Sequence, residues 1–159
     1  MKKKLLVLAL ISTTVYGAWH LRSDSSPPQA SQASLVLDRI WIDHMPRNDK
    51  DMFHAFVAIT EQPFGVFQET SQWKGNFELF NYEANGDELR IVYPQSGDRD
   101  KVTATANPCS EKGMDFCLEL KGARRGVKRY YSMKGWEIDH AARPEDVRAR
   151  IDALASTAP

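Results

Sequence analysis

Residues 73–94, WKGNFELFNYEANGDELRIVYP, contain two runs rich in aromatic and branched side chains. Between the runs stands Asn85-Gly86, and an Asn-Gly pair in this setting is the strongest short-range signal for a β-hairpin. Because side chains alternate between the two faces of a strand, the register of this hairpin decides which of them face the core. The hairpin therefore indicates both the fold class and the position of the core.

Two registers are compatible with this hairpin. A two-residue loop of Asn85-Gly86 would pair Tyr82 with Leu89 and divide the apolar side chains between both faces of the sheet. A three-residue loop over residues 84–86, with its glycine in the left-handed conformation, places Leu79 opposite Ile91 and Phe77 opposite Tyr93. One face is then apolar and the other charged, so we predict the three-residue, bulged loop.

Composition places the chain among ordinary globular proteins. It has 159 residues, of which 42% are hydrophobic and 26% charged, and this length suits one domain with a leader. The whole chain has no net charge. Removing residues 1–22, which include Lys2, Lys3, Lys4 and Arg22, leaves 17 basic and 21 acidic residues, a net charge of −4. This mildly acidic domain has no general attraction to nucleic acid, which we do not expect as a partner.

Residues 1–18, MKKKLLVLALISTTVYGA, follow the pattern of a secretory signal peptide: three lysines, an apolar run, and small residues before a cut at Ala18. The alternative is an uncleaved anchor that extends to about residue 21. Residues 19–34 are rich in Ser, Pro and Gln, which predicts a flexible linker. We expect the single domain, residues 35–159, to be secreted or periplasmic, or else held at the membrane outside the cytoplasm.

The two cysteines, Cys109 and Cys117, flank a short polar turn. In an oxidising compartment we predict a disulfide across this hairpin, which contributes about 2–3 kcal/mol in the loop-closure model. The alternation of Phe116, Leu118 and Leu120 leaves Cys117 on the other face of its strand, as the bridge requires. A reactive or metal-binding thiol is the alternative, but no histidine and no second cysteine pair stands nearby.

Runs with strand character recur along the domain, with short connections and no helix between them. They cover residues 35–43, 52–60, 64–70, 73–83, 88–93, 101–106, 115–121 and 127–138. The first run changes phase near Arg39, which suggests a bulge. Short connections make neighbouring strands antiparallel, and a meander of about eight strands favours an up-and-down barrel. A strongly curved open sheet or a two-sheet sandwich is the alternative.

One helix is predicted at the C-terminal end, over residues 144–155. Pro144 suits the first helical position, and the acidic residues after it complement the positive end of the helix dipole. Val147, Ile151 and Leu154 then repeat at helical spacing. This narrow apolar stripe should pack on the outside of the barrel. The predicted fold is therefore mainly β, with a single C-terminal helix.

This layout resembles the calycin class, the lipocalin-like barrels, over residues 35–155. The resemblance lies in the order of the elements. Lipocalins carry Gly-x-Trp on their first strand, whereas Trp41 here has no glycine two residues before it, and Trp73-Lys74-Gly75 has the two residue types in reversed order. The resemblance therefore implies an architecture and no binding residues. QWKGNFELF and RGVKRYYSMKGWEI also resemble secreted proteins of myxobacteria-like Gram-negative bacteria, which implies a compartment and no chemistry.

We predict a candidate ligand site inside the barrel. Trp73, Phe77 and Tyr93 face the interior in the predicted register. On the last strand Arg129 shares the parity of Tyr131, and its guanidinium could bind an anionic head group there. Alternatively the arginine packs on a tryptophan and closes the barrel end, or the alternation of side chains breaks near Gly126. The interior can also be filled by side chains, because an eight-stranded barrel either just does so or holds one small ligand.

Residues 121–129, KGARRGVKR, carry five basic side chains and no acid. We interpret Lys121, Arg124, Arg125 and Lys128 as a basic rim that could bind an anion or a partner protein. A solvated loop is the alternative, because a run of charge in a loop needs no partner.

No catalytic or metal-binding signature stands in the sequence, so we predict no metal and no cofactor. The histidines are scattered without ligand spacing: His20, His44, His54 and His140. Asp43-His44 could supply a general base, but a nucleophile is missing. We expect a non-catalytic binding protein for a small apolar or anionic molecule or an envelope protein. A structural or interaction module of the cell envelope with a filled core ranks second, and an enzyme third.

Overall fold

The computed structural model describes residues 35–139 and 142–156. The predicted leader over residues 1–18, its alternative as an anchor to residue 21, and the linker over residues 19–34 lie outside the described residues. His20 and His140 lie outside them as well.

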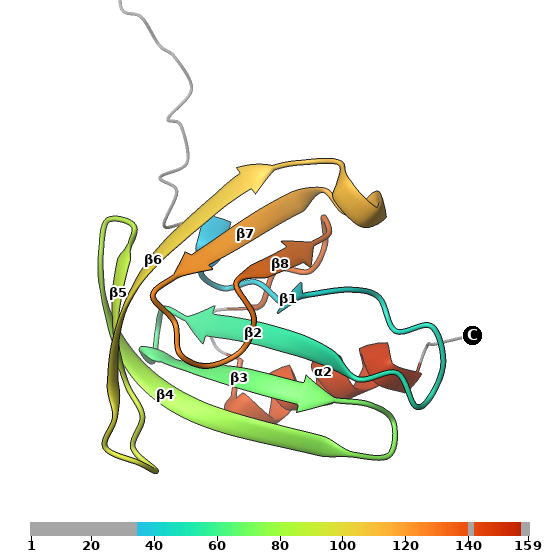
Figure 1. The fold of residues 1–159 in the computed structure, drawn as a ribbon, viewed down its shortest axis with the longest axis horizontal. Helices are drawn as coiled ribbons and strands as arrows, with labels where there is room; N and C mark the ends of the chain where they lie inside the picture. Colours follow the sequence, from blue (N-terminus) through green and yellow to red (C-terminus); the bar gives the residue numbers. More distant parts are fainter. Residues whose placement is uncertain (1–34, 140–141, 157–159) are drawn as a thin grey trace, which may run out of the picture.

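Eight antiparallel strands close into a barrel in the order of the sequence (Figure 1). The strands are β1 (Trp41–Ile42), β2 (Phe53–Ile59), β3 (Phe64–Thr70), β4 (Gly75–Asn85), β5 (Glu88–Val92), β6 (Arg99–Pro108), β7 (Phe116–Lys121) and β8 (Arg129–Ser132). The pairing of Ile42 with Tyr131 joins β1 to β8 and closes the ring. The predicted meander and its closure are confirmed, and the short connections explain why each strand pairs with its neighbour in sequence.

The strands at the seam of the barrel are shorter than predicted. Asp38 has a φ of 54°, so the chain turns there, and residues 35–36 are helical instead of extended. The change of phase near Arg39 thus marks the end of a turn, after which that residue forms an isolated bridge with Glu137. β8 is likewise much shorter than the predicted residues 127–138. β3, by contrast, has the predicted bounds.

Large aromatic side chains fill the interior of the barrel. Five of them are at most 1% exposed: Trp41, Phe56, Phe80, Tyr93 and Tyr130. Aliphatic side chains of the same cluster surround the rings: Ala58, Leu89, Ile91, Val102, Ala104, Ala106, Leu118 and Leu120. The alternation predicted for Phe116, Leu118 and Leu120 on β7 is confirmed, and side chains of β6 alternate inward in the same way.

The central hairpin has a register different from the predicted one. Asn85 pairs with Glu88, so the loop has two residues, Gly86 and Asp87, and not the three predicted. Gly86 has a φ of 64°. A glycine in this first loop position is typical of a type II′ turn, whose twist matches that of the flanking strands.

This register exchanges the two faces of β4. Phe80 and Tyr82 point into the barrel, whereas Phe77 and Leu79 point outward. Leu79 packs against the outer cluster and Phe77 is 50% exposed. The predicted register was wrong because it assumed that only one face of this strand is covered, whereas both faces carry apolar side chains.

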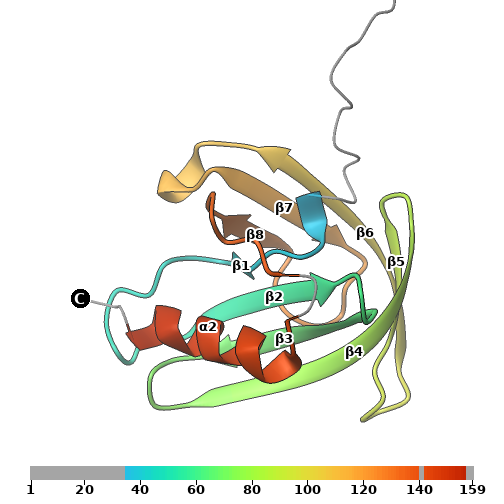
Figure 2. The same cartoon turned by 180° about the vertical axis from the view of Figure 1, so that it is seen from behind.

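A helix forms a second layer on the outside of the barrel. α2 (Pro144–Ser156) lies across β2 and β3 (Figure 2), which confirms the helix predicted over residues 144–155. Its buried side chains, Val147, Ile151 and Ala155, pack against the outer face of β2 in a second apolar cluster. β2 is thus covered on both faces, as its continuous apolar run predicted. Among the described residues, no helix combines the length and apolar content needed to cross a membrane.

The predicted disulfide between Cys109 and Cys117 is present, with 5.7 Å between the two Cα atoms. It closes the connection between β6 and β7, which contains the short 3-10 helix η1 (Glu111–Gly113). Leu118 and Leu120 face the interior, while Cys117 packs with the outer cluster. This agrees with the parity argument made from the sequence.

Candidate functional site

The middle of the barrel is a packed aromatic core. Ring centroids lie 5.2 Å apart for Phe56 and Phe67, 5.1 Å for Phe67 and Phe80, and 5.9 Å for Phe56 and Tyr130. These separations are those of rings in direct contact. An eight-stranded barrel is either filled by its own side chains or holds one small ligand, and in this layer the side chains fill it.

Segments on opposite sides of the barrel cover this core. Val36 is 1% exposed and belongs to the interior cluster, and the indole nitrogen of Trp41 donates a hydrogen bond to its carbonyl oxygen at 2.9 Å. On the other side, the β7–β8 loop, residues 122–128, packs on β3: a Cβ added to Gly126 would lie 2.7 Å from Phe67. Figures 1 and 2 show the two segments on opposite sides.

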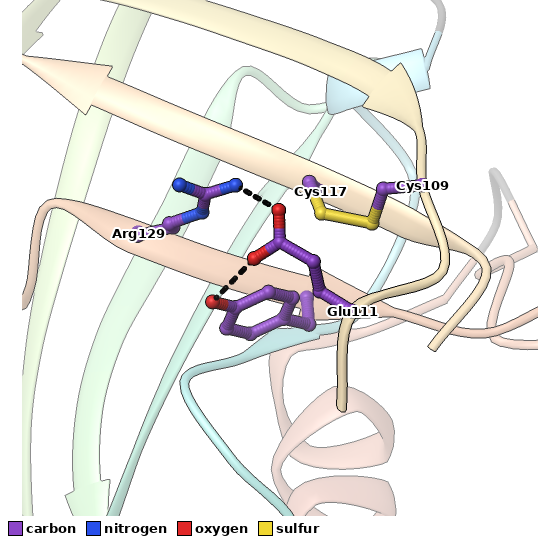
Figure 3. Close-up of a disulfide and its surroundings, with 5 residues drawn as sticks. Cys109, Glu111, Cys117 and Arg129 are labelled. Carbon is purple, nitrogen blue, oxygen red and sulfur yellow. Dashed lines mark hydrogen bonds and ion pairs between the residues drawn. A yellow bond between two sulfur atoms is a disulfide. The ribbon is translucent and has the colours of Figure 1, made fainter. Parts of the chain in front are cut away.

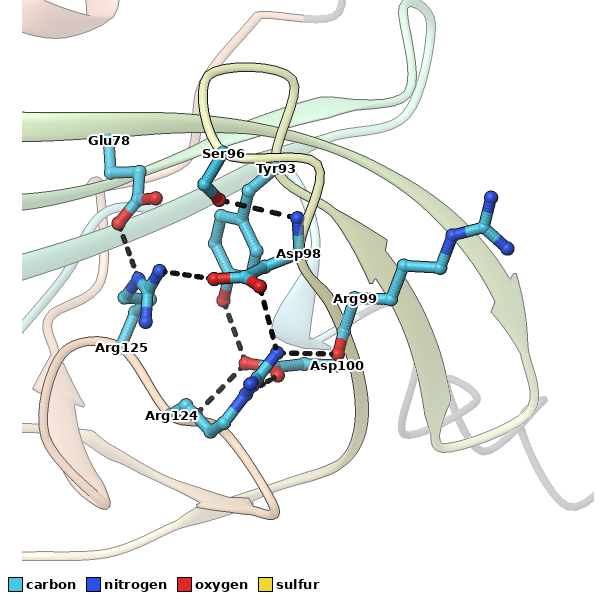
Figure 4. Close-up of polar contacts among 8 residues, drawn as sticks. All are labelled: Glu78, Tyr93, Ser96, Asp98, Arg99, Asp100, Arg124 and Arg125. Carbon is cyan, nitrogen blue, oxygen red and sulfur yellow. Dashed lines mark hydrogen bonds and ion pairs between the residues drawn. The ribbon is translucent and has the colours of Figure 1, made fainter.

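Two arginines fasten the β7–β8 loop through a group of ion pairs that we call the latch: Arg124, Arg125, Glu78, Asp98 and Asp100 (Figure 4). The backbone nitrogen of Arg124 donates to Asp100 at 3.0 Å, and its Nε donates to the same carboxylate at 2.5 Å. Arg125 pairs with Glu78 at 2.6 Å and with Asp98 at 2.9 Å. The latch therefore joins the loop to β4, to the β5–β6 loop and to β6.

Asp100 is the buried centre of the latch, with a side chain only 2% exposed. It also accepts a hydrogen bond from the Tyr93 hydroxyl at 3.0 Å. Burial acts to raise the pKa of this carboxyl group, but the hydrogen bonds from Arg124 and Tyr93 outweigh burial and hold the pKa below its ordinary value. Asp100 is thus ionised at neutral pH and balances the charge of Arg124.

The residues predicted as a basic rim do not form one surface. Arg124 and Arg125 turn toward the acids of the latch, and Lys121 lies 3.6 Å from Glu119. Lys128 is exposed on the loop. The run of basic residues is thus used in large part to close the barrel, and neither a free basic rim nor a fully solvated loop describes it.

Arg129 lies outside the barrel, contrary to our prediction. It pairs with Glu111 of η1, next to the disulfide, and the Tyr131 hydroxyl donates to the same carboxylate at 3.3 Å (Figure 3). β8 instead turns Tyr130 inward, where its hydroxyl accepts a hydrogen bond from the backbone nitrogen of Val127 at 2.9 Å. Val127 and Tyr130 both contact the interior cluster, so the alternation breaks between them, which was one of the alternatives considered.

Trp73 and Phe77 also lie outside. Trp73 is 71% exposed in the β3–β4 turn, and its indole nitrogen donates to Asp49 at 2.9 Å. The guanidinium of Arg148 on α2 lies 4.9 Å from the centre of the Phe77 ring. Of the five residues predicted to bind a ligand, Tyr93 alone lies within the barrel, so these residues do not converge on one site.

A different concave surface stands out on the outer face of the barrel. A groove of about 1070 Å³ lies over the start of β3 and over β4, β5 and β6. The long strands β4 and β6 are strongly bent (Figure 1). The borders of the groove include Pro63 in the β2–β3 turn, Pro94 after β5, and Pro144 at the start of α2. Figure 2 shows this end of α2 beside β3 and β4.

Strand register determines which side chains line the floor of the groove. One row of directly paired residues crosses β3 to β6: Phe64, Asn81, Val92 and Arg99. The next row contains Glu83, Arg90 and Lys101. Val92 is 37% exposed, although it is apolar. The groove thus has an apolar side towards β3 and α2, and a polar side towards β6.

Two of the cations along the groove are paired with a carboxylate, whereas a third is not paired with any described residue. Glu88 lies 3.1 Å from Arg90 and 2.7 Å from Lys101, and hydrogen bonds from Lys101 and Arg90 lower the pKa of its carboxyl group. Arg99 differs from these two cations. Its carbonyl oxygen accepts a hydrogen bond from Arg124, but its guanidinium has no hydrogen bond or ion pair with any residue that the structure describes. Figure 4 shows it pointing away from the latch.

The groove continues beneath the first turns of α2. A hollow of about 260 Å³ shares lining residues with it: Phe64, Leu79 and Pro144. The hollow extends to Phe77 and to Gln68, which is 5% exposed. The Gln68 side chain donates to Asp152 at 3.1 Å, but its oxygen has no hydrogen-bond partner within the described residues. A buried polar atom of a residue that lines this hollow therefore has unused hydrogen-bonding capacity.

The Asp43-His44 pair connects the β1–β2 loop to β2. Nδ1 of His44 lies 2.9 Å from the Asp43 carboxylate, and Nδ1 of His54 lies 3.1 Å from it. The backbone nitrogen of His54 also donates to Asp43 at 2.9 Å. In the part of the chain that the structure describes, no three His, Cys, Asp or Glu side chains are arranged to hold a metal ion. The absence of catalysis stays a prediction.

The closed barrel with its C-terminal helix has the architecture that the resemblance to calycins implies. Membership of that class stays a prediction. Comparisons with protein-family models, with curated proteins and with solved structures found no match to this chain.

Proposed function

We propose that this protein is a non-catalytic binding protein of an oxidising compartment outside the cytoplasm, either secreted or periplasmic, and that it binds a largely apolar ligand in its outer groove. The disulfide between Cys109 and Cys117 supports the compartment, because such bonds persist mainly in secreted and periplasmic proteins. The signal peptide predicted over residues 1–18 supports it as well.

The observation that carries the proposal is the contrast between the groove and the interior. Small-molecule sites are concave and mainly apolar, with a few polar groups, and have volumes of about 300–1,000 Å³. The groove, at about 1070 Å³, lies just above this range, and Phe64, Leu79 and Val92 contribute apolar surface to it. The interior is occupied by rings in contact with one another. Binding on the outer face therefore fits this barrel better than binding inside it.

Native mass spectrometry of the protein purified from its own source tests the proposal. The wild-type protein should retain a small molecule, and Asn81→Trp should lose it, because the added ring fills the floor of the groove. Lys121→Trp is the matched control, since this side chain is 69% exposed and lies outside the groove. A protein without ligand, or a ligand retained equally by both variants, would contradict the proposal.

A second candidate function is that of an interaction module of the cell envelope with a filled core. The exposed aromatic side chains of Trp73 and Phe77 favour it, because exposed aromatic residues are common where proteins contact one another. In this case the same spectra should show a bound protein. Trp73→Ser should then release the partner, and Asn81→Trp should leave it bound.

A further inference from the structure

We infer that the ligand of the outer groove is an amphiphile with one anionic end, whose head group binds Arg99 and whose apolar part extends over Val92 towards Phe64 and the hollow beneath α2. This inference rests on the proposed function, because it names the ligand class for the same groove. The shared chemistry of the head group is an oxyanion, a carboxylate or a phosphate.

The charge pattern places the anionic end at β6. Arg90 and Lys101 already share the carboxylate of Glu88, whereas the guanidinium of Arg99 is uncompensated by any described residue. A guanidinium presents parallel N–H groups that match two oxygens of a carboxylate or phosphate. Glu83 lies on β4, opposite Arg90, and would repel an anion there. The head group is therefore directed to the edge formed by Arg99.

The apolar part has a continuous path away from this edge. Arg99, Val92, Asn81 and Phe64 are neighbours on successive strands. With a strand spacing of about 4.8 Å, three such steps span about 14 Å along the sheet. Beyond Phe64 the path enters the hollow of about 260 Å³ under α2. A flexible chain of medium length fits this path, with its far end protected from water by the helix.

The floor of the groove favours an alkyl chain over an extended peptide. Its strands, β3 to β6, pair with one another along the row, so their backbone groups are engaged in the sheet. A peptide added to a sheet gains its affinity from free backbone groups at an edge. Along this row β3, β4 and β5 have a partner strand on both sides, and the carbonyl oxygen of Arg99 on β6 accepts a hydrogen bond from Arg124. A peptide would thus leave its own N–H and C=O groups unsatisfied over the apolar part, a cost that an alkyl chain does not have.

Calorimetric titration of the full chain with four probes of equal chain length tests the inference: decanoate, decyl phosphate, decanol and decylamine. Both anionic probes should bind more tightly than decanol, and decylamine should bind most weakly. The tighter of the two anions identifies the head group. Raised salt should weaken the anionic probes and leave decanol unchanged, because it screens exposed charges.

Two variants locate the two ends of the ligand. Arg99→Gln should weaken decanoate about fivefold and leave decanol unchanged, as expected for one exposed ion pair. Leu79→Ala should weaken all four probes, because this side chain lines both the groove and the hollow. Arg47→Gln is the control, since its side chain is 85% exposed at another place and should not affect binding.

The outcomes separate this inference from the proposed function. Equal binding of decanoate and decanol would overturn the anionic class and leave an apolar site in the groove. If Arg99→Gln weakens decanoate binding no more than Arg47→Gln does, the placement of the head group at Arg99 is wrong. Failure of every probe to bind would contradict both the inference and the proposed function.

Discussion

Replacement of Asp100 by asparagine should loosen the β7–β8 loop and destabilise the folded protein. The carboxylate accepts three hydrogen bonds, one from the Tyr93 hydroxyl and two from Arg124. Asparagine keeps the shape but removes the charge, and its NH2 group must then face a donor. We expect the free energy of unfolding at neutral pH to fall by about 2–3 kcal/mol. Breaking a fully buried pair costs about 3–5 kcal/mol, but the Arg124 side chain is 54% exposed, so water compensates part of the loss.

The pH dependence provides a second test of the same reasoning. The pKa of Asp100 lies below its ordinary value of 3.8, so its ionised form stabilises the fold above the unfolded-state pKa. This stabilisation is lost as the pH falls through the folded-state pKa. The difference between wild type and Asp100→Asn should therefore be complete above about pH 5 and shrink at lower pH.

Urea unfolding followed by tryptophan fluorescence measures this difference. Asp98→Asn is the matched control: its side chain is 43% exposed, so we expect a loss below about 1 kcal/mol. The reasoning is refuted if Asp100→Asn costs less than about 0.5 kcal/mol at neutral pH, or if its cost stays the same in acid.

Four further changes test other parts of the fold by urea unfolding. Gly126→Ala should cost about 2–4 kcal/mol, since this residue has a φ of 66° and an added Cβ would lie 2.1 Å from a buried tyrosine hydroxyl. Gly86→Ala should cost about 1 kcal/mol, because Gly86 has a φ of 64° but open space around it. Equal costs for the two glycine variants would argue against the close contact at Gly126. Replacing both Cys109 and Cys117 by alanine should cost about 2–3 kcal/mol, and reactive thiols in the native wild type would contradict the bridge. Gln68→Leu should change stability by less than about 1 kcal/mol, because losing its unpartnered oxygen offsets the lost hydrogen bond, and a larger loss would reveal a partner for that oxygen.

Sequence patterns correctly predict those parts of the barrel in which a single physical rule determines the structure. Short connections left little choice but antiparallel neighbours, so the order of the strands followed from the chain itself. β2 is apolar at nearly every position, and this predicted cover on both of its faces. β4 is also covered in part on both faces, by Phe80 inside and Leu79 outside, but polar residues stand between its apolar ones. Assigning all apolar side chains to one face therefore led to the wrong register.

The site depended on long-range contacts that alternation cannot reveal. Arg124 and Asp100 meet although 24 residues separate them. One signal did point to the latch: the basic residues 121–129 follow β7, and the acidic residues Asp98 and Asp100 stand at the start of β6, its neighbour in the sheet. For the groove, the available signal was Val92, an exposed apolar side chain that lies among polar side chains on the outer face of the barrel. The depth of the groove, however, arises from the bending of β4 and β6, which residue types do not predict.

The latch and the groove are connected through two adjacent residues of β6. Asp100 must point inward to balance Arg124, and successive side chains of a strand point to opposite faces. Arg99 must therefore point outward, into the groove, where no described acid meets it. Its carbonyl oxygen also accepts a hydrogen bond from Arg124 at 2.8 Å, so the latch holds the backbone of Arg99 in place. The positive charge that we assign to ligand binding is thus positioned by the same contacts that close the barrel.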